Sequence, residues 1–243
     1  MPEEEKIPAL KDKTVLIIGR GSGIARSIAL AVREDGGGVI AAGLKPGDLA
    51  DAYRGTDISI EQVDVTDESS VAALAGRIAK LDHVVSTASA RARGGYADLT
   101  AGLVAASFST KVTGALLLAK HFAGNLPSDG SFLFMSGATA LKPAPGLLAV
   151  AATNAAVDAI TAGLAVELAP IRVNAIAPGT IDTGAYDALG DERKAALFKA
   201  RSATNPARRI GTADDIAAAA LAALTNGFLT GVSIPVDGGE HLV

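Results

Sequence analysis

The feature of this sequence that most constrains its fold is a regular alternation of short apolar runs with longer segments rich in Ala and Leu. Runs such as residues 15–18 (VLII) contain only aliphatic side chains, which is typical of strands buried on both faces of a parallel sheet. The longer segments between them are typical of helices that cross from one parallel strand to the next. We therefore predict an α/β fold with three layers, in which helices cover both faces of a doubly wound sheet of about seven parallel strands.

The expected elements follow one another along nearly the whole chain. Strands are expected near residues 14–18, 39–42, 58–63, 83–86, 131–135, 172–176 and 233–236. Helices are expected near residues 23–34, 67–79, 99–123, 147–169, 188–201 and 213–224. Because no Pro/Ser-rich linker, shift in composition or internal repeat divides the sequence, we expect residues 1–243 to form a single domain.

Composition narrows the class of function. Hydrophobic residues make up 49% of the 243 residues and charged residues 20%, which favours a folded protein with a large core. A net charge of −4 argues against nucleic acid as a partner, since nucleic-acid binders carry basic faces. The chain has no cysteine and only three scattered histidines, so disulfides and thiolate nucleophiles are excluded and a metal site is not expected.

The N-terminal sequence and the lengths of the apolar runs indicate where in the cell the protein is expected. Residues 1–6 (MPEEEK) are acidic, whereas a secretory signal begins with a basic and then an apolar stretch. No uninterrupted apolar run reaches the roughly 18 residues that span a bilayer. We therefore expect a cytoplasmic protein without a membrane partner.

A glycine-rich turn joins the first expected strand to the first expected helix. Residues 18–25 read IGRGSGIA, with glycines at 19, 21 and 23. Glycines let backbone amides come close to a pyrophosphate, and the N-terminus of the following helix attracts its negative charge. The turn predicts a dinucleotide site. A purely structural glycine turn is the alternative, which the position after the first strand disfavours.

The residues after the second expected strand bear on the choice of nicotinamide cofactor. A carboxylate at this place would bind a ribose 2′-hydroxyl, but the sequence has Leu44 and Lys45 there, and no acidic residue precedes Asp48. Arg20 and Lys45 are both able to reach a 2′-phosphate, so NADP(H) is favoured over NAD(H). The alternative is that both are solvated surface charges.

Further motifs make the chain similar to the short-chain dehydrogenase/reductase family from about Lys11 to Gly239. These motifs are Asp64–Val65, residues 86–89 (STAS), residues 172–174 (RVN), Pro178–Gly179 and residues 236–239 (VDGG). The resemblance implies a Rossmann-type domain, a small-molecule substrate and a homodimer or homotetramer. The cofactor residues it implies are Gly19, Arg20, Ser22, Gly23, Ile24, Leu44, Lys45, Asp64, Val65, Ser86, Ala88, Pro178, Gly179, Ile181 and Thr183.

The chain departs from this family at all four positions where the family carries its catalytic Asn, Ser, Tyr and Lys. These positions hold Lys111, Gly137, Val150 and Asn154, and Ser136 is the neighbour of Gly137. A positioned general acid contributes about 10²–10⁴-fold to a rate, and valine has no proton to donate. Ordinary ketone reduction by the family mechanism is therefore not expected.

Three possibilities remain open for the chemistry. Lys111 is a candidate proton donor or orienting group in one pocket with Asn154 and Ser136, because a desolvated lysine titrates near neutrality. Alternatively, the hydride acceptor is an iminium or a polarised alkene that needs orientation more than an acid. As a third possibility, the protein binds NADP(H) without catalysis, as a sensor or scaffold.

The segment after the sixth expected strand resembles the family's substrate lid. We expect this lid segment to cover residues 181–207, with Tyr186 packed inside it or, less favourably, entering the pocket. Tyr96 is a weaker candidate of the same kind. Arg91 and Arg93 are able to attract an acidic substrate, although solvated loop arginines are the more common case.

Overall fold

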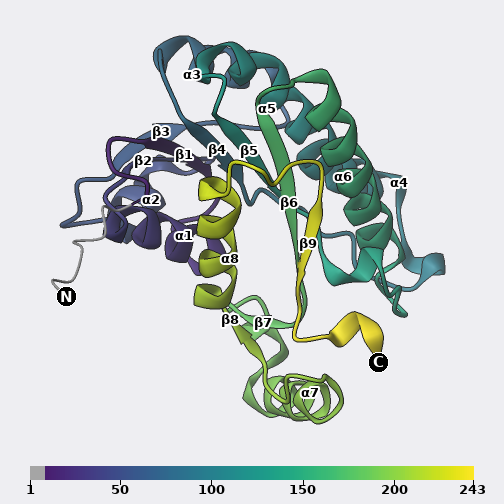
Figure 1. Ribbon diagram of the computed structural model, residues 1–243. Helices are drawn as coiled ribbons and strands as arrows, with labels where there is room; N and C mark the ends of the chain where they lie inside the picture. Colours follow the sequence, from purple (N-terminus) through teal and green to yellow (C-terminus); the bar gives the residue numbers. More distant parts are fainter. Residues whose placement is uncertain (1–8) are drawn as a thin grey trace, which may run out of the picture.

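Seven parallel strands form the central sheet in the order β3-β2-β1-β4-β5-β6-β9, as the ribbon of this computed structural model shows (Figure 1). The strands are β1 Thr14–Ile18, β2 Gly38–Gly43, β3 Ser59–Gln62, β4 His83–Ser86, β5 Ser131–Met135, β6 Arg172–Pro178 and β9 Ser233–Val236. The structure describes residues 9–243. The acidic segment 1–6, for which no secretory signal was predicted, lies outside the described residues. The predicted doubly wound parallel sheet is confirmed.

The direction of winding reverses between β1 and β4. β1 pairs with β2 on one side, with Val15 opposite Val39, and with β4 on the other, with Val15 opposite His83. Two neighbouring strands at such a switch point send their following loops in opposite directions, which opens a crevice beyond their carboxyl ends. In folds of this kind ligands bind at such a switch point, which here lies at the ends of β1 and β4.

Helices cover both faces of the sheet. Their bounds are α1 Gly23–Glu34, α2 Pro46–Ala52, α3 Glu68–Arg77, α4 Ala101–Phe108, α5 Gly114–Phe122, α6 Leu148–Glu167, α7 Asp191–Thr204 and α8 Ala213–Thr225. α1 and α8 pack together over one face, and α3, α5 and α6 lie over the other (Figure 1). Val15 and Ile17 of β1 belong to the first core, and Leu16 and Ile18 belong to the second. The alternation of side chains along a strand thus supplies both cores.

The structure adds elements that the pattern did not predict. The expected helix 99–123 begins two residues later and is divided, because a π-helical turn at Ser109–Thr113 separates α4 from α5. The short helix α2 is separated from β2 only by Leu44 and Lys45. A two-stranded ribbon of β7 Ile181–Asp182 and β8 Gly211–Thr212 lies beneath the carboxyl edge of the sheet, next to α7 (Figure 1).

Two helical segments are long and apolar enough to cross a membrane by length and composition. They are Ala101–Asn125 and α6. Core helices of folded proteins meet the same criterion, so the finding is weak evidence for a membrane. In this fold α5 packs on α3 and α6 packs on β6, so both segments form part of the helical layer over the sheet.

Candidate active site

The glycine turn after β1 leaves the N-terminus of α1 open to an anion. Ser22 is the N-cap of α1, its side chain caps no backbone amide, and the first turn of the helix carries no acidic residue. A Cβ at Gly19 would lie 2.1 Å from the hydroxyl oxygen of Thr87, and Gly23 has φ of +55°. Glycine is therefore required at both positions. The free helix amides and the close backbone fit a pyrophosphate, and the predicted Ile24 lies in the first turn of α1.

The residues that follow β2 contain no carboxylate able to hold a ribose. Leu44 is 65% exposed, and Lys45 lies 3.8 Å from Asp48, with both charged side chains at least three-quarters exposed. Arg20 is exposed and forms no ion pair with any other residue in the range 9–243. Arg20 and Lys45 are thus two exposed cations, and a phosphate group is the kind of ligand that such cations attract.

The carboxyl ends of β3 and β4 and the loops after them contain the next four predicted cofactor residues. One carboxylate oxygen of Asp64, Oδ1, accepts bonds from the amide (2.9 Å) and the hydroxyl (2.7 Å) of Thr66. Val65 is buried beside Gly114 of α5. Ser86 is buried at the end of β4 and Ala88 follows it two residues later. The predicted cofactor residues Asp64, Val65, Ser86 and Ala88 therefore all lie at or just beyond the carboxyl ends of β3 and β4.

The loop after β6 packs against both the C-terminal segment and the glycine turn. Pro178 is the last residue of β6, and a Cβ at Gly179 would lie 2.6 Å from the Cβ of Asp237. Ile181 is buried. Thr183 lies against the glycine turn, because a Cβ at Gly23 would be 3.0 Å from the Cβ of Thr183. The structure therefore brings Thr183 next to the proposed pyrophosphate position.

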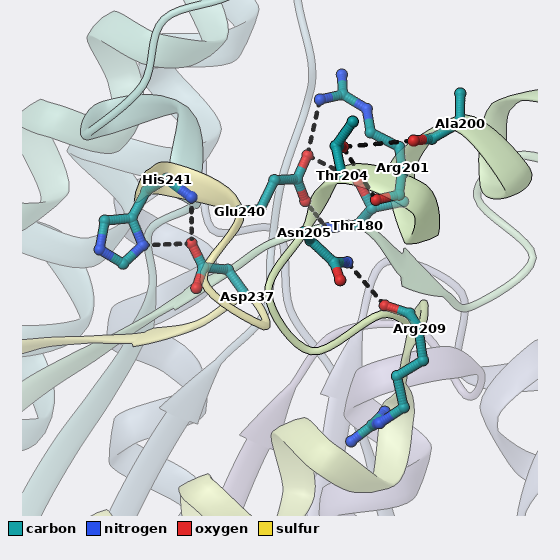
Figure 2. Close-up of polar contacts among 9 residues, drawn as sticks. All are labelled: Thr180, Ala200, Arg201, Thr204, Asn205, Arg209, Asp237, Glu240 and His241. Atoms are coloured by element: carbon teal, nitrogen blue, oxygen red, sulfur yellow. Dashed lines mark hydrogen bonds and ion pairs between the residues drawn. The ribbon is translucent and has the colours of Figure 1, made fainter. Parts of the chain in front are cut away.

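The C-terminal segment anchors the base of the lid segment. Figure 2 shows the carboxylate of Glu240 between the backbone amide of Thr180 (2.8 Å) and the guanidinium of Arg201 (2.9 Å). Beside it, a carboxylate oxygen of Asp237 accepts bonds from the amide (3.0 Å) and the ring (2.6 Å) of His241. The loop after β6 and α7 are thereby tied to the chain end.

Lys111 contacts both of the other predicted catalytic residues, Ser136 and Asn154. It lies in the π-helical turn, and its ammonium donates to the backbone carbonyl oxygen of Ser136 (3.0 Å) and to the side-chain oxygen of Asn154. The hydroxyl of Ser136 donates to the backbone carbonyl of Asn154 (3.2 Å). The three predicted residues therefore contact one another, although the Ser136 hydroxyl is used inside the protein.

Burial governs the protonation of Lys111. Desolvation lowers the pKa of its ammonium to about 7, the nearby Arg91 guanidinium lowers the pKa further, and the Asp158 carboxylate opposes both. Because an isolated charge is costly to bury, the two acceptors at Ser136 and Asn154 stabilise the ammonium form. Lys111 is therefore able to gain or release a proton near neutral pH.

Asn154 fills the space that a side chain at position 137 would need. A Cβ at Gly137 would lie 2.5 Å from the amide nitrogen of Asn154. That nitrogen donates to the hydroxyl of Thr139 at 2.7 Å, and Asn154 is 3% exposed. Val150 lies one helical turn before Asn154 and is half-buried. Thr139 was missed from the sequence because its contact depends on how α6 packs beside β5.

Aromatic side chains of the lid segment pack together. The ring of Tyr186 meets that of Phe198 edge-on at 5.5 Å, and the guanidinium of Arg93 lies 5.9 Å from the Tyr186 ring centre. Tyr186 therefore packs inside the lid segment, as the sequence favoured, and Tyr96 is exposed.

Burial and Arg93 lower the pKa of Arg91. Within residues 9–243 no group of His, Asp and Glu is arranged to hold a metal ion.

Comparisons with known proteins agree with this geometry. The family model described as enoyl-(acyl carrier protein) reductase matches residues 18–241. An uncharacterised oxidoreductase of Mycobacterium tuberculosis is 34% identical over 95% of this chain and 92% of its own length. The 1-cyclohexenylcarbonyl-CoA reductase of Streptomyces collinus is 29% identical over 94% of this chain and 86% of its own.

Solved structures show the same relationship. A small-chain dehydrogenase solved in complex with NADPH has a TM-score of 0.81 and 33% identity, with 95% of this chain and 99% of that chain covered. Together, the fold, the glycine turn and the match over residues 18–241 show that this chain belongs to the short-chain dehydrogenase/reductase family of oxidoreductases.

Proposed function

We propose that this protein is an NADP(H)-dependent oxidoreductase with a non-standard active site, in which Val150 and Asn154 occupy the positions of the family's Tyr and Lys. The observation that carries the proposal is the direct contact between the Lys111 ammonium and Asn154. The family places an amide at position 111 and an ammonium at position 154, and this chain places the same two groups in exchanged positions. An ammonium is thus retained at the site, although its burial is costly.

The residues of this chain would bind cofactor and substrate in two adjoining places. The free amides of α1, together with Arg20 and Lys45, would hold the phosphates, while Asn154 and Lys111 lie beyond the end of β5. When bound, NADPH supplies a hydride. Lys111, with a pKa of about 7, is suited to donate a proton or to orient an electron-rich group.

The substrate classes that suit this site are acceptors that need less help from an acid than a plain ketone does. They are an iminium, a polarised alkene and an activated carbonyl. The polarised alkene has independent support, because enoyl and cyclohexenylcarbonyl thioesters, the compounds named in the matched descriptions, contain an alkene conjugated to a carbonyl. A panel of imines, enones, enoyl thioesters and ketones tests the proposal through oxidation of NADPH.

Cofactor preference gives a prediction that needs no substrate. Replacing both Arg20 and Lys45 with alanine should raise the Kd for NADPH about 10- to 100-fold. A charged hydrogen bond to phosphate contributes about 1.5–3 kcal/mol, and the exposure of both side chains reduces their combined contribution to about 1.4–2.8 kcal/mol. Binding of NADH should change less than about threefold. Fluorescence titration of the two cofactors measures this, with Arg54→Ala, an exposed arginine at the end of α2 paired with Asp51, as the control. Equal losses for both cofactors would contradict the assignment.

The second candidate function is a catalytically inactive NADP(H)-binding protein that acts as a sensor or scaffold. Two observations favour it: Val150 has no ionisable group, and two of the three ammonium donors of Lys111 are used within the protein. It requires tight NADPH binding without oxidation across the whole panel. Reproducible turnover of any panel member removes it.

We also propose that the protein assembles as a cytoplasmic homodimer or homotetramer. The helices α4, α5 and α6 expose large apolar side chains, namely Leu103, Leu116, Leu148 and Val166, and such surfaces are typical of subunit interfaces. Light scattering coupled to size exclusion should give two or four times 24.3 kDa. Leu116→Glu and Val166→Glu together should shift the mass toward one copy, and a single-copy mass for the unmodified protein would contradict the proposal.

A further inference from the structure

The hydroxyl of Thr139 is held in place but has an unused hydrogen. Thr139 lies in the 3₁₀ turn Ala138–Ala140 that follows β5, at the carboxyl edge of the sheet. Its oxygen accepts a bond of 2.7 Å from the side-chain nitrogen of Asn154. Among residues 9–243 no acceptor lies within hydrogen-bond distance of its own hydrogen, and the side chain is partly exposed. A hydroxyl in this state is available to a ligand.

The direction of the hydrogen bonds follows from the chemistry of Lys111. An ammonium only donates, so the oxygen of the Asn154 amide must face it and the nitrogen must face Thr139. The nitrogen only donates as well, so the Thr139 oxygen accepts and its own hydrogen is directed elsewhere. Three groups therefore form a chain of donors that starts at the ammonium and ends at the hydroxyl.

The chain makes the Thr139 hydroxyl a better donor than an isolated threonine. Each bond in such a chain polarises the next, by about 10–30% per bond. The donor of the first bond, the Lys111 ammonium, carries a full positive charge. Charge-assisted hydrogen bonds are about twice as strong as neutral ones. Lys111 thereby acts on a ligand through Asn154 without touching it.

We propose that Thr139 donates a hydrogen bond to the substrate oxygen that becomes negatively charged during reduction, and that Lys111 and Asn154 position and polarise this hydroxyl. The inference rests on the proposed function. Among the acceptor classes it selects those with an oxygen, namely a carbonyl or an alkene conjugated to a carbonyl, over an iminium. The serine that the family places at position 137 is excluded here by Asn154.

The reduction balances without an ionised threonine. For a conjugated alkene, the hydride and its electron pair go to the β-carbon, and the displaced π pair comes to rest on the carbonyl oxygen. Thr139 keeps its proton and stabilises this oxygen, and water then supplies the proton that completes the product. The charged groups that act on Lys111 are Arg91, which is positive, and Asp158, which is negative. With the Lys111 ammonium, the net charge is positive and favours an oxyanion.

The test uses 4-nitrophenol, an oxyanion mimic whose phenolate form is coloured, with the full-length protein saturated with NADP⁺. The unmodified protein should bind the phenolate and lower the apparent pKa of the phenol. Thr139→Val should weaken this binding about tenfold or more, whereas Thr139→Ser should stay within about threefold. Thr225→Val is the matched control, because that hydroxyl bonds a carbonyl of its own helix, α8, at 2.8 Å. The Kd for NADPH should change less than twofold in all variants.

The outcomes separate this inference from the proposed function. Loss of phenolate binding in Thr139→Val with rescue in Thr139→Ser supports the donor role, even if no member of the panel is reduced, in which case the proposed catalysis alone fails. Equal phenolate binding by Thr139→Val and the unmodified protein overturns the inference, and so does a serine variant that behaves like valine. A protein that reduces panel substrates but binds no phenolate also overturns it and leaves the proposed function standing.

Discussion

Lys111→Met is expected to reduce turnover about 10²–10⁴-fold on any substrate that the protein reduces, which is the range for loss of a positioned acid. The reason is that, within residues 9–243, the Lys111 ammonium is the only charged group bonded to Asn154 and Ser136. In the unmodified protein, kcat/KM should fall above a pKa near 7, since burial lowers the pKa of this ammonium to about 7. Steady-state kinetics from pH 5.5 to about pH 9 measure both effects.

Lys120→Met is the matched control for this loss. Lys120 lies nine residues further along the same helical segment, is exposed, and pairs with Glu68 of α3. Its replacement should leave turnover within about twofold, because exposed ion pairs contribute little. NADPH should bind Lys111→Met with a Kd within about threefold of the unmodified value. Full activity in Lys111→Met would show that the lysine has no chemical role.

The second large effect is expected on stability, and its sign follows from the pKa of Lys111. The ordinary value of 10.5 applies to the unfolded chain, and the folded value is about 7. Below pH 7 both states carry the proton, so the folded protein bears the full cost of the buried charge. Between pH 7 and pH 10.5 the unfolded chain binds more protons, so the free energy of unfolding rises with pH. The whole window corresponds to at most about 5 kcal/mol.

Urea unfolding at several pH values checks this rise. Between pH 7.5 and 9.5, the unmodified protein should become more stable relative to Lys111→Met. The difference in their unfolding free energies should grow by about 1 kcal/mol or more for each pH unit. His83 does not interfere, because burial lowers the pKa of its imidazole to about 4. A constant difference over this range would show that Lys111 keeps an ordinary pKa.

The fold could be predicted largely from the sequence because aliphatic runs identify buried parallel strands. Each of the seven predicted strands lies within two residues of the observed one at both ends. The helix α2 was missed because its seven residues are too few to show helical periodicity, although Pro46 at its first turn is a recognised start signal. The π-helical turn leaves no mark on periodicity either, since it adds one residue within a continuous helical segment.

The site could be predicted in part. The positions of Lys111 and Asn154 follow from motif spacing. The two residues come into contact because they lie on the helical segments that follow the neighbouring parallel strands β4 and β5. The sequence could not show that the Ser136 hydroxyl is used by the backbone of α6, nor that Thr139 receives the Asn154 amide. Both depend on the distance between a strand end and a helix, which packing determines.

The close fit of Asn154 against Gly137 also restricts how this site can evolve. A serine gained at position 137 would clash with the Asn154 amide at 2.5 Å. A lysine gained at position 154 would place a second ammonium beside that of Lys111. A change at position 137 or 154 alone toward the arrangement common in the family is therefore unfavourable. Residues 111, 137 and 154 are expected to tolerate replacement only as a group.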